Sequence, residues 1–119
     1  MWEERYGYAR AVVAGSHVFV SGTAPQMPDG ADPPPGAYEQ AQRCLEIIRA
    51  ALSEAGTAPA DVVRTHVYVS DREHIADVMR AHGETFGDSR PACTGLVVQL
   101  LDPRWLVEIE VEAILPDTP

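Results

Sequence analysis

The chain has 119 residues, enough for a single hydrophobic core, so residues 1–119 are predicted to form one domain. A formal net charge of −9 disfavours contact with a phosphate backbone, and we expect no nucleic-acid partner. No apolar run approaches the roughly 20 residues that span a bilayer, and the N-terminus lacks a secretory signal, which indicates a cytoplasmic protein without a membrane partner.

The residue types present also exclude several kinds of chemistry. All nine cations are arginines, so catalysis through a lysine Schiff base is excluded. The two cysteines, Cys44 and Cys93, have no metal-ligand spacing and indicate a reducing compartment rather than a disulfide framework. The histidines show no metal-ligand spacing either, so we expect neither a metal ion nor another cofactor.

The first predicted element is a β-hairpin near the N-terminus. Residues 8–13 and 17–22 are rich in β-branched and aromatic side chains, and residues 14–16 supply the turn. Residues 26–37 follow with an Asp29-Gly30 pair and three consecutive prolines, a composition that predicts an irregular surface loop.

A helix and a strand are predicted next, over residues 38–55 and 62–69. Apolar residues recur at steps of three and four in the first segment, and Gly56 provides its stop signal. In the second segment, side chains alternate between two faces of a strand. One face is expected to carry Val63, Thr65, Val67 and Val69, and the other Arg64, His66 and Tyr68.

A second helix is predicted over residues 71–86. Ser70 and Glu73 fit a capping box at its start, and Gly87 follows its end. Its buried stripe is expected to consist of Ile75, Val78, Met79, His82 and Phe86. We interpret His82 as a core histidine with a hydrogen-bond partner rather than as a ligand.

The chain ends in two strands that are predicted to meet, the first introduced by Pro91 and the second spanning residues 106–115. The second alternates strictly, with Val107, Ile109, Val111 and Ala113 on one face and Glu108, Glu110 and Glu112 on the other. Three carboxylates on one face repel one another, so we expect Glu108 and Glu112 to be solvated or paired with Arg10 or Arg64. His66 is expected to join a polar cross-strand network.

The order strand, strand, helix, strand, helix, strand, strand indicates an α+β domain. One mixed sheet with both helices packed on the same face satisfies the predicted periodicities. The opposite face of that sheet is left uncovered, which favours oligomerisation.

Three separated segments carry a resemblance to a known family. They are Gly7-Tyr8-Ala9-Arg10-Ala11-Val12, Val18-Phe19-Val20-Ser21-Gly22-Thr23-Ala24-Pro25, and the stretch from Pro91-Ala92-Cys93-Thr94 to Val107-Glu108-Ile109-Glu110-Val111-Glu112-Ala113. The chain resembles the RidA/YjgF family, the reactive-intermediate deaminases that hydrolyse enamines and imines, over residues 7–114. The resemblance implies a chorismate-mutase-like fold and a homotrimer, with a central barrel and pockets between adjacent subunits.

The resemblance also implies roles for single residues. Glu110 matches the glutamate that is thought to position water, so it is the expected catalytic residue. Tyr8 and Ser21 match a tyrosine and a serine of the family pocket. Met79 stands where many members have asparagine, and Cys93 stands where the family has its carboxylate-binding arginine.

The exchange at Cys93 bears directly on the substrate. A thiol is a weak hydrogen-bond donor and a thiolate would repel a carboxylate, so Cys93 cannot replace a guanidinium. We therefore do not expect activity on the usual 2-imino acids. Arg90, Arg10 and Arg104 are the alternatives for a replacement. Arg104, on the lengthened loop before the last strand, is a better spare arginine than Arg90, which lies on the opposite face of an extended segment. We favour a pocket-lining thiol over a nucleophile, because no histidine spacing pairs with Cys93.

Two functions of different classes follow from these residues. The leading hypothesis is a RidA-like hydrolase that acts on a small imine, enamine or related electrophile, with Glu110 as the catalytic residue and Tyr8, Ser21, Met79, Cys93 and Arg104 as substrate-binding residues. The alternative is a trimeric small-molecule-binding protein without turnover, with ligands in the inter-subunit clefts. A ribonuclease, as attributed to some relatives, is disfavoured by the negative charge.

Overall fold

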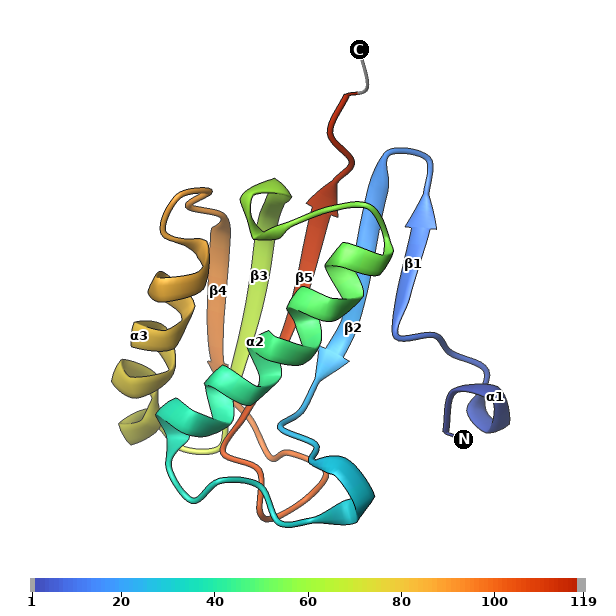
Figure 1. The fold of residues 1–119 in the computed structure, drawn as a ribbon. Helices are drawn as coiled ribbons and strands as arrows, with labels where there is room; N and C mark the ends of the chain where they lie inside the picture. The colour runs from blue at the N-terminus through green and yellow to red at the C-terminus, as the bar shows by residue number, and fades with distance from the viewer. Residues whose placement is uncertain (1, 118–119) are drawn as a thin grey trace.

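The computed structural model describes residues 2–117. Five strands form one sheet in the order β1-β2-β5-β3-β4, in which only the β3–β4 pair is parallel. Helices α2 and α3 cover one face of this sheet (Figure 1). The elements are α1 (Trp2–Tyr6), β1 (Ala11–Ala14), β2 (His17–Thr23), α2 (Ala37–Glu54), β3 (Val62–Val69), α3 (Ile75–Phe86), β4 (Ala92–Val97) and β5 (Val107–Ile114), with 3₁₀ turns at Pro28–Gly30, Pro59–Asp61 and Arg72–His74. The expected mixed sheet with both helices on one face is confirmed.

The hydrophobic core lies between the helices and the covered face of the sheet. The apolar positions of β5 are buried, whereas its three glutamates are half-buried on the opposite face, so the predicted alternation is confirmed. Each buried aliphatic side chain contributes roughly 1.5–3 kcal/mol through removal of apolar surface from water. The core residues from α2 include Ala41, Cys44, Leu45, Ile48 and Leu52.

A hydrogen-bonded polar pair is embedded in this apolar layer. His82 on α3 is buried, and its Nε2 lies 2.8 Å from the Thr65 hydroxyl of β3. Burial lowers the pKa of His82, so the neutral imidazole is favoured in the fold. The interpretation of His82 as a core histidine with a partner is confirmed.

The two final strands do not meet, contrary to the prediction. Strand β3 lies between β4 and β5, pairing in parallel with β4 and antiparallel with β5. Their burial follows from this order: the central strand β5 is buried on alternate residues, whereas all six residues of the edge strand β4 are exposed. The parallel β3–β4 pair also needs a crossover connection, which α3 provides.

Two local predictions also require correction. Val63 is 45% exposed and Val62 is buried in its place, because a register irregularity between Val62 and Arg64 shifts the alternation at the start of β3. The second helix is preceded by the Arg72–His74 3₁₀ turn, whose cap is Asp71 rather than Ser70. The Asp71 carboxylate accepts a hydrogen bond of 2.9 Å from the Glu73 backbone N–H.

The N-terminal segment differs from the prediction as well. Residues 2–6 form the short helix α1, and β1 begins only at Ala11, so Tyr8 lies outside the strand in which it was expected. Gly7 has a φ of +77°, a left-handed conformation that suits the residue following a helix. Within residues 2–117, no helix is both long and apolar enough to cross a membrane.

Candidate functional site

The candidate site lies at one end of the sheet, where β2 and β3 finish and β5 begins. The loops that follow β2 and β4 meet at this end, the lower end in Figure 1. Gln40 of α2 joins these loops to each other, because its amide N–H groups donate to the Pro34 carbonyl (2.8 Å) and the Arg104 carbonyl (3.0 Å). Its amide oxygen accepts from the Leu106 backbone N–H at 2.8 Å.

Glu110 of β5 is held by two side chains of β3. The Tyr68 hydroxyl donates a hydrogen bond to Glu110 Oε1, and His66 Nδ1 lies 3.3 Å from the same oxygen. This hydrogen bond is the main cause that raises the pKa of Tyr68 to about 12, so the phenol stays protonated and acts as a donor. The polar cross-strand network expected for His66 is confirmed.

Glu110 also borders a cavity of about 370 Å³. Its wall includes Tyr68, Glu108 and Gly22, and residues 98–101 of the loop after β4 complete it. The Glu110 side chain is 37% exposed, which leaves its carboxylate accessible to water. A half-exposed carboxylate with a fixed orientation can accept a proton from a bound water molecule.

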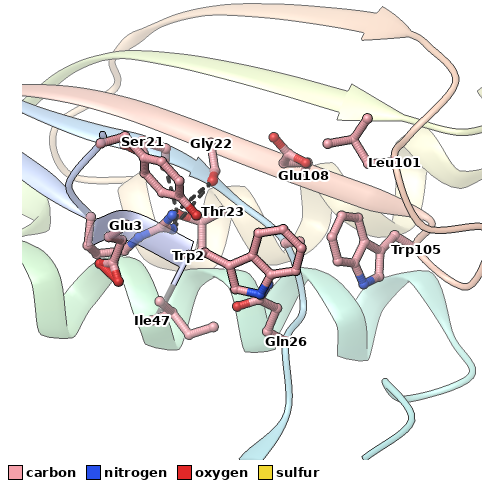
Figure 2. Close-up of a pocket in the computed structure, with 13 residues that line it drawn as sticks. Trp2, Glu3, Ser21, Gly22, Thr23, Gln26, Ile47, Leu101, Trp105 and Glu108 are labelled. Carbon is pink, nitrogen blue, oxygen red and sulfur yellow. Dashed lines mark hydrogen bonds between the residues drawn. The ribbon is translucent and has the colours of Figure 1, made fainter. Parts of the chain in front are cut away.

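A second cavity, of about 490 Å³, shares Gly22, Leu101 and Glu108 with the first. Figure 2 shows its wall, which combines side chains from the N-terminal segment, β2, α2 and the loop before β5. Tyr8 and Ser21 both line this cavity, as expected for pocket residues. The Ser21 hydroxyl, however, donates a 2.6 Å hydrogen bond to the Ala9 carbonyl.

Glu108 was not singled out for the site by the sequence, yet it borders both cavities. Its carboxylate packs against Gly22 so closely that a Cβ at that position would overlap it, so a larger residue there would displace the Glu108 carboxylate. Burial is the main cause that raises the pKa of Glu108, and the nearby charge of Glu110 adds to the effect.

Of the two environments predicted for the glutamates of β5, solvation or arginine pairing, no ion pair with an arginine is present among residues 2–117. Glu112 lies 3.5 Å from His17 Nδ1. The Arg10 guanidinium donates instead to the Thr23 hydroxyl at 2.6 Å and to the Gly22 carbonyl at 3.3 Å. In the described part of the chain, no side chain forms an ion pair or a hydrogen bond with the carboxylate of Glu108.

Arg104 does not line either cavity. Its guanidinium binds Asp32 at 2.8 Å and Asp102 at 2.8 Å and 3.1 Å, and these hydrogen bonds, led by Asp102, raise its pKa. The same interaction lowers the pKa of Asp102. The guanidinium therefore already has two carboxylate partners and links the two loops that surround the site.

Cys93 and Met79 also lie away from the two cavities. Cys93 is an exposed free thiol on the edge strand β4, and its register partner is Thr65, whose side chain faces the helices. Paired residues of neighbouring strands share a face, so Cys93 and Glu110 lie on opposite faces of the sheet within one subunit. Met79 packs partly buried against the hydrophobic core. Among residues 2–117, no three histidine, cysteine or acidic side chains gather as a metal site would require.

Comparison with known proteins identifies the family. The family model described as "Endoribonuclease L-PSP" matches residues 3–115. A RutC family protein of Pyrococcus abyssi is 36% identical over 89% of this chain and 84% of its own length. The crystal structure of Rv2704 from Mycobacterium tuberculosis, a member of the YjgF/YER057c/UK114 family, matches with a TM-score of 0.86 and 36% identity over 96% of this chain and 92% of that one.

The chain belongs to the RidA/YjgF family. Another relative, a putative reactive intermediate deaminase, TdcF, of Escherichia coli K12, is 29% identical over 90% of this chain and 84% of its own length. The family membership and the fold expected from the sequence are thus confirmed. Tyr68, Glu108, Trp2 and Trp105 are among the cavity residues that the sequence analysis missed. Tyr68 had been placed on the correct face of β3, but only the observed register brings it to Glu110.

Proposed function

We propose that this RidA/YjgF protein hydrolyses a small imine or enamine that carries no carboxylate at the usual position. The observation that carries the proposal is the Glu110 carboxylate, which borders a cavity and is oriented by the Tyr68 hydroxyl and the His66 ring. The name of the Escherichia coli relative, a putative reactive intermediate deaminase, supports this class of reaction.

In the proposed reaction, Glu110 removes a proton from water while the water oxygen forms a bond to the carbon of a protonated C=N group. The π electrons move to nitrogen and give a neutral carbinolamine. Glu110 then returns the proton to nitrogen, the C–N bond breaks as the hydroxyl forms the carbonyl, and ammonia leaves with the hydroxyl proton as ammonium. The balance is R₂C=NH₂⁺ + H₂O → R₂C=O + NH₄⁺. Tyr68 and His66 keep the carboxylate in one orientation, which general base catalysis requires.

Two observations support a substrate without a carboxylate. The position of the family arginine is occupied by Cys93, which cannot form a bidentate pair with a carboxylate. Arg104 is already bound to Asp32 and Asp102, so recruiting it would require breaking those contacts.

We also propose that the protein works as a homotrimer. The open face of the sheet exposes apolar side chains such as Phe19 and Leu96 beside the carboxylates, which supports association through this face. Cys93 and Glu110 lie on opposite faces of one sheet, so a pocket that contains both would need two subunits.

The description of the matching family model names an endoribonuclease, which raises RNA as a substrate. The charge of −9 opposes it, because RNA-binding surfaces are positively charged and attract phosphates. The glutamates beside the two cavities oppose it further.

The test offers a 2-imino acid and a carboxylate-free imine, each generated in situ, to the wild type and to Glu110→Gln, Cys93→Ser and Cys93→Arg. We expect the wild type to hydrolyse only the carboxylate-free imine. Glu110→Gln should lower kcat/KM by about 10²–10⁴-fold, the typical contribution of a general base, and Cys93→Ser should retain activity. Cys93→Arg should gain activity on the imino acid. Hydrolysis that survives Glu110→Gln, or no acceleration of either compound by the wild type, would contradict the proposal.

A further inference from the structure

The larger of the two cavities has a composition that the reaction at Glu110 does not explain. Its wall contains Trp2 and Trp105, which are the two tryptophans of the chain, together with Tyr8. Figure 2 shows both indoles in the wall below Glu108, which projects from β5. Three aromatic rings and a carboxylate therefore surround one space of about 490 Å³.

The charges around this space favour a cation. Glu108 and Glu3 contribute two carboxylates, and Arg10 contributes the one guanidinium of the wall. Arg10 donates to the Thr23 hydroxyl and the Gly22 carbonyl rather than to Glu108. The carboxylate of Glu108 is half-buried and, among residues 2–117, has no side-chain partner within hydrogen-bond or ion-pair distance.

The rest of the wall suits an apolar body attached to that cation. Ile47, Leu101 and Ala24 line the cavity beside the aromatic rings. Aromatic faces attract ammonium groups through their quadrupole, also at sites that are open to solvent. A volume of this size lies within the range of small-molecule sites.

We propose that this cavity binds a small organic cation, an ammonium or iminium group on an apolar body, with Glu108 as its counter-ion and the indoles of Trp2 and Trp105 around it. Because Glu108 also borders the cavity of Glu110, a cation held there adjoins the proposed catalytic carboxylate. The further statement that this cation is the substrate rests on the proposed function, whereas the binding itself does not.

The intrinsic fluorescence of the protein provides a direct measurement, because both of its tryptophans line this cavity. Three probes of similar shape are titrated: cyclohexylammonium, cyclohexanol and cyclohexanecarboxylate. We expect saturable fluorescence changes with cyclohexylammonium, at least about tenfold weaker binding of the neutral alcohol, and no saturation with the carboxylate. Equal affinity for the three probes, or tighter binding of the carboxylate, would overturn the proposal.

Glu108→Gln is the decisive variant, and Glu112→Gln is its matched control on the same strand and the same face of the sheet. Both remove one negative charge, but only Glu108 borders the cavity, whereas Glu112 lies beside His17. We expect Glu108→Gln to weaken cyclohexylammonium binding about 10–100-fold and to leave cyclohexanol unchanged. Glu112→Gln should bind like the wild type. An equal loss of cyclohexylammonium affinity in both variants would show that only the net charge matters. That result would overturn the proposal that Glu108 is the counter-ion.

The same titration separates this inference from the proposed function. If imine hydrolysis is absent but cyclohexylammonium still binds through Glu108, the cation site stands and the hydrolase proposal fails. If imines are hydrolysed but the protein shows no preference for the ammonium probe, the hydrolase proposal stands and the cation site fails. Glu110→Gln, which should lose hydrolysis, is expected to retain cyclohexylammonium binding within about threefold.

Discussion

The two faces of the sheet differ in what they contribute to the protein, and β5 makes the difference visible because it supplies both. On the face covered by α2 and α3, Ile109 and its neighbours are buried in an apolar layer, within which Thr65 and His82 form a polar pair. On the open face, Glu110 contacts Tyr68 and His66, and Glu108 borders two cavities. Residues that alternate along β5 thus have two roles: those on the covered face stabilise the fold, and those on the open face border the candidate site.

The comparison also explains why the polar groups on the two faces behave differently. On the covered face, a polar group must find a partner within the protein, because an unpaired buried group costs about 1–3 kcal/mol. On the open face of the single subunit, carboxylates can remain next to one another because water solvates them. A carboxylate without a protein partner is tolerated there and is available to bind a ligand.

The largest expected effect comes from shortening a side chain on the covered face. Ile109→Ala should lower the free energy of unfolding by about 2–5 kcal/mol, because Ile109 is fully buried and its loss leaves a cavity. Glu112→Ala, on the same strand but the open face, should change it by less than about 0.5 kcal/mol. Urea denaturation at one fixed protein concentration measures both. A similar cost for the two variants would contradict the division between the faces.

A smaller effect is expected from the pH dependence of the covered face. Burial lowers the pKa of His82 below its ordinary value of 6.5, so the unfolded chain binds more protons than the fold between the two pKa values. The free energy of unfolding should not depend on the titration of His82 above pH 6.5. Below pH 6.5 it should decrease by at most about 1.4 kcal/mol per pH unit.

Denaturation curves measured between pH 7.5 and pH 5 would test this expectation. The decrease in the free energy of unfolding at low pH should be smaller in His82→Gln. This variant keeps a polar group beside Thr65 but cannot gain a proton. The assignment to His82 is wrong if His82→Gln keeps the full pH dependence of the wild type.

The smallest expected effect is a gain of stability on the open face. The pKa of Glu108 is raised in the fold, so the fold binds more protons than the unfolded chain and its stability falls as the pH rises through that pKa. At neutral pH the ionised carboxylate therefore destabilises the protein. Glu108→Gln should raise Tm at pH 7, by the equivalent of a fraction of 1 kcal/mol because solvent screens the charge.

Thermal unfolding of Glu108→Gln at pH 7 and at pH 4 measures this gain, which should shrink at the lower pH. Glu112→Gln serves again as the control for net charge. A lower Tm of Glu108→Gln than of the wild type at pH 7 would contradict the argument. The variant expected to lose cation binding is thus expected to be the more stable protein.

The sequence predicted the covered face more fully than the open face. The alternation of β5 and the helical spacing of α2 report burial directly, so Ile109 and Leu45 could be placed in the core from sequence alone. Val63 was predicted on the wrong face of β3 because the register irregularity depends on pairing with β5. The local alternation of apolar and polar residues does not reveal it. The order of β3, β4 and β5 could not be predicted for the same reason, since it is decided by tertiary packing.

The site was predicted only in part. Glu110, Tyr8 and Ser21 were found through the family resemblance, and the structure places all three beside the two cavities. Tyr68 reaches Glu110 from another strand, and such contacts depend on a register that no periodicity specifies. Trp105 comes from a loop whose path is set by tertiary contacts, so its place in the wall was not predictable.

Gln40, which connects the loop after β2 to the segment before β5, also has a dynamic consequence. Its buried amide bonds Pro34 in the loop after β2, and Arg104 and Leu106 in the segment before β5. If either segment moves away from α2, it loses its hydrogen bond to the Gln40 amide. The same amide also holds the other segment. Amide hydrogen exchange in the two segments should therefore be coupled, so that Gln40→Ala is expected to lower the protection of both.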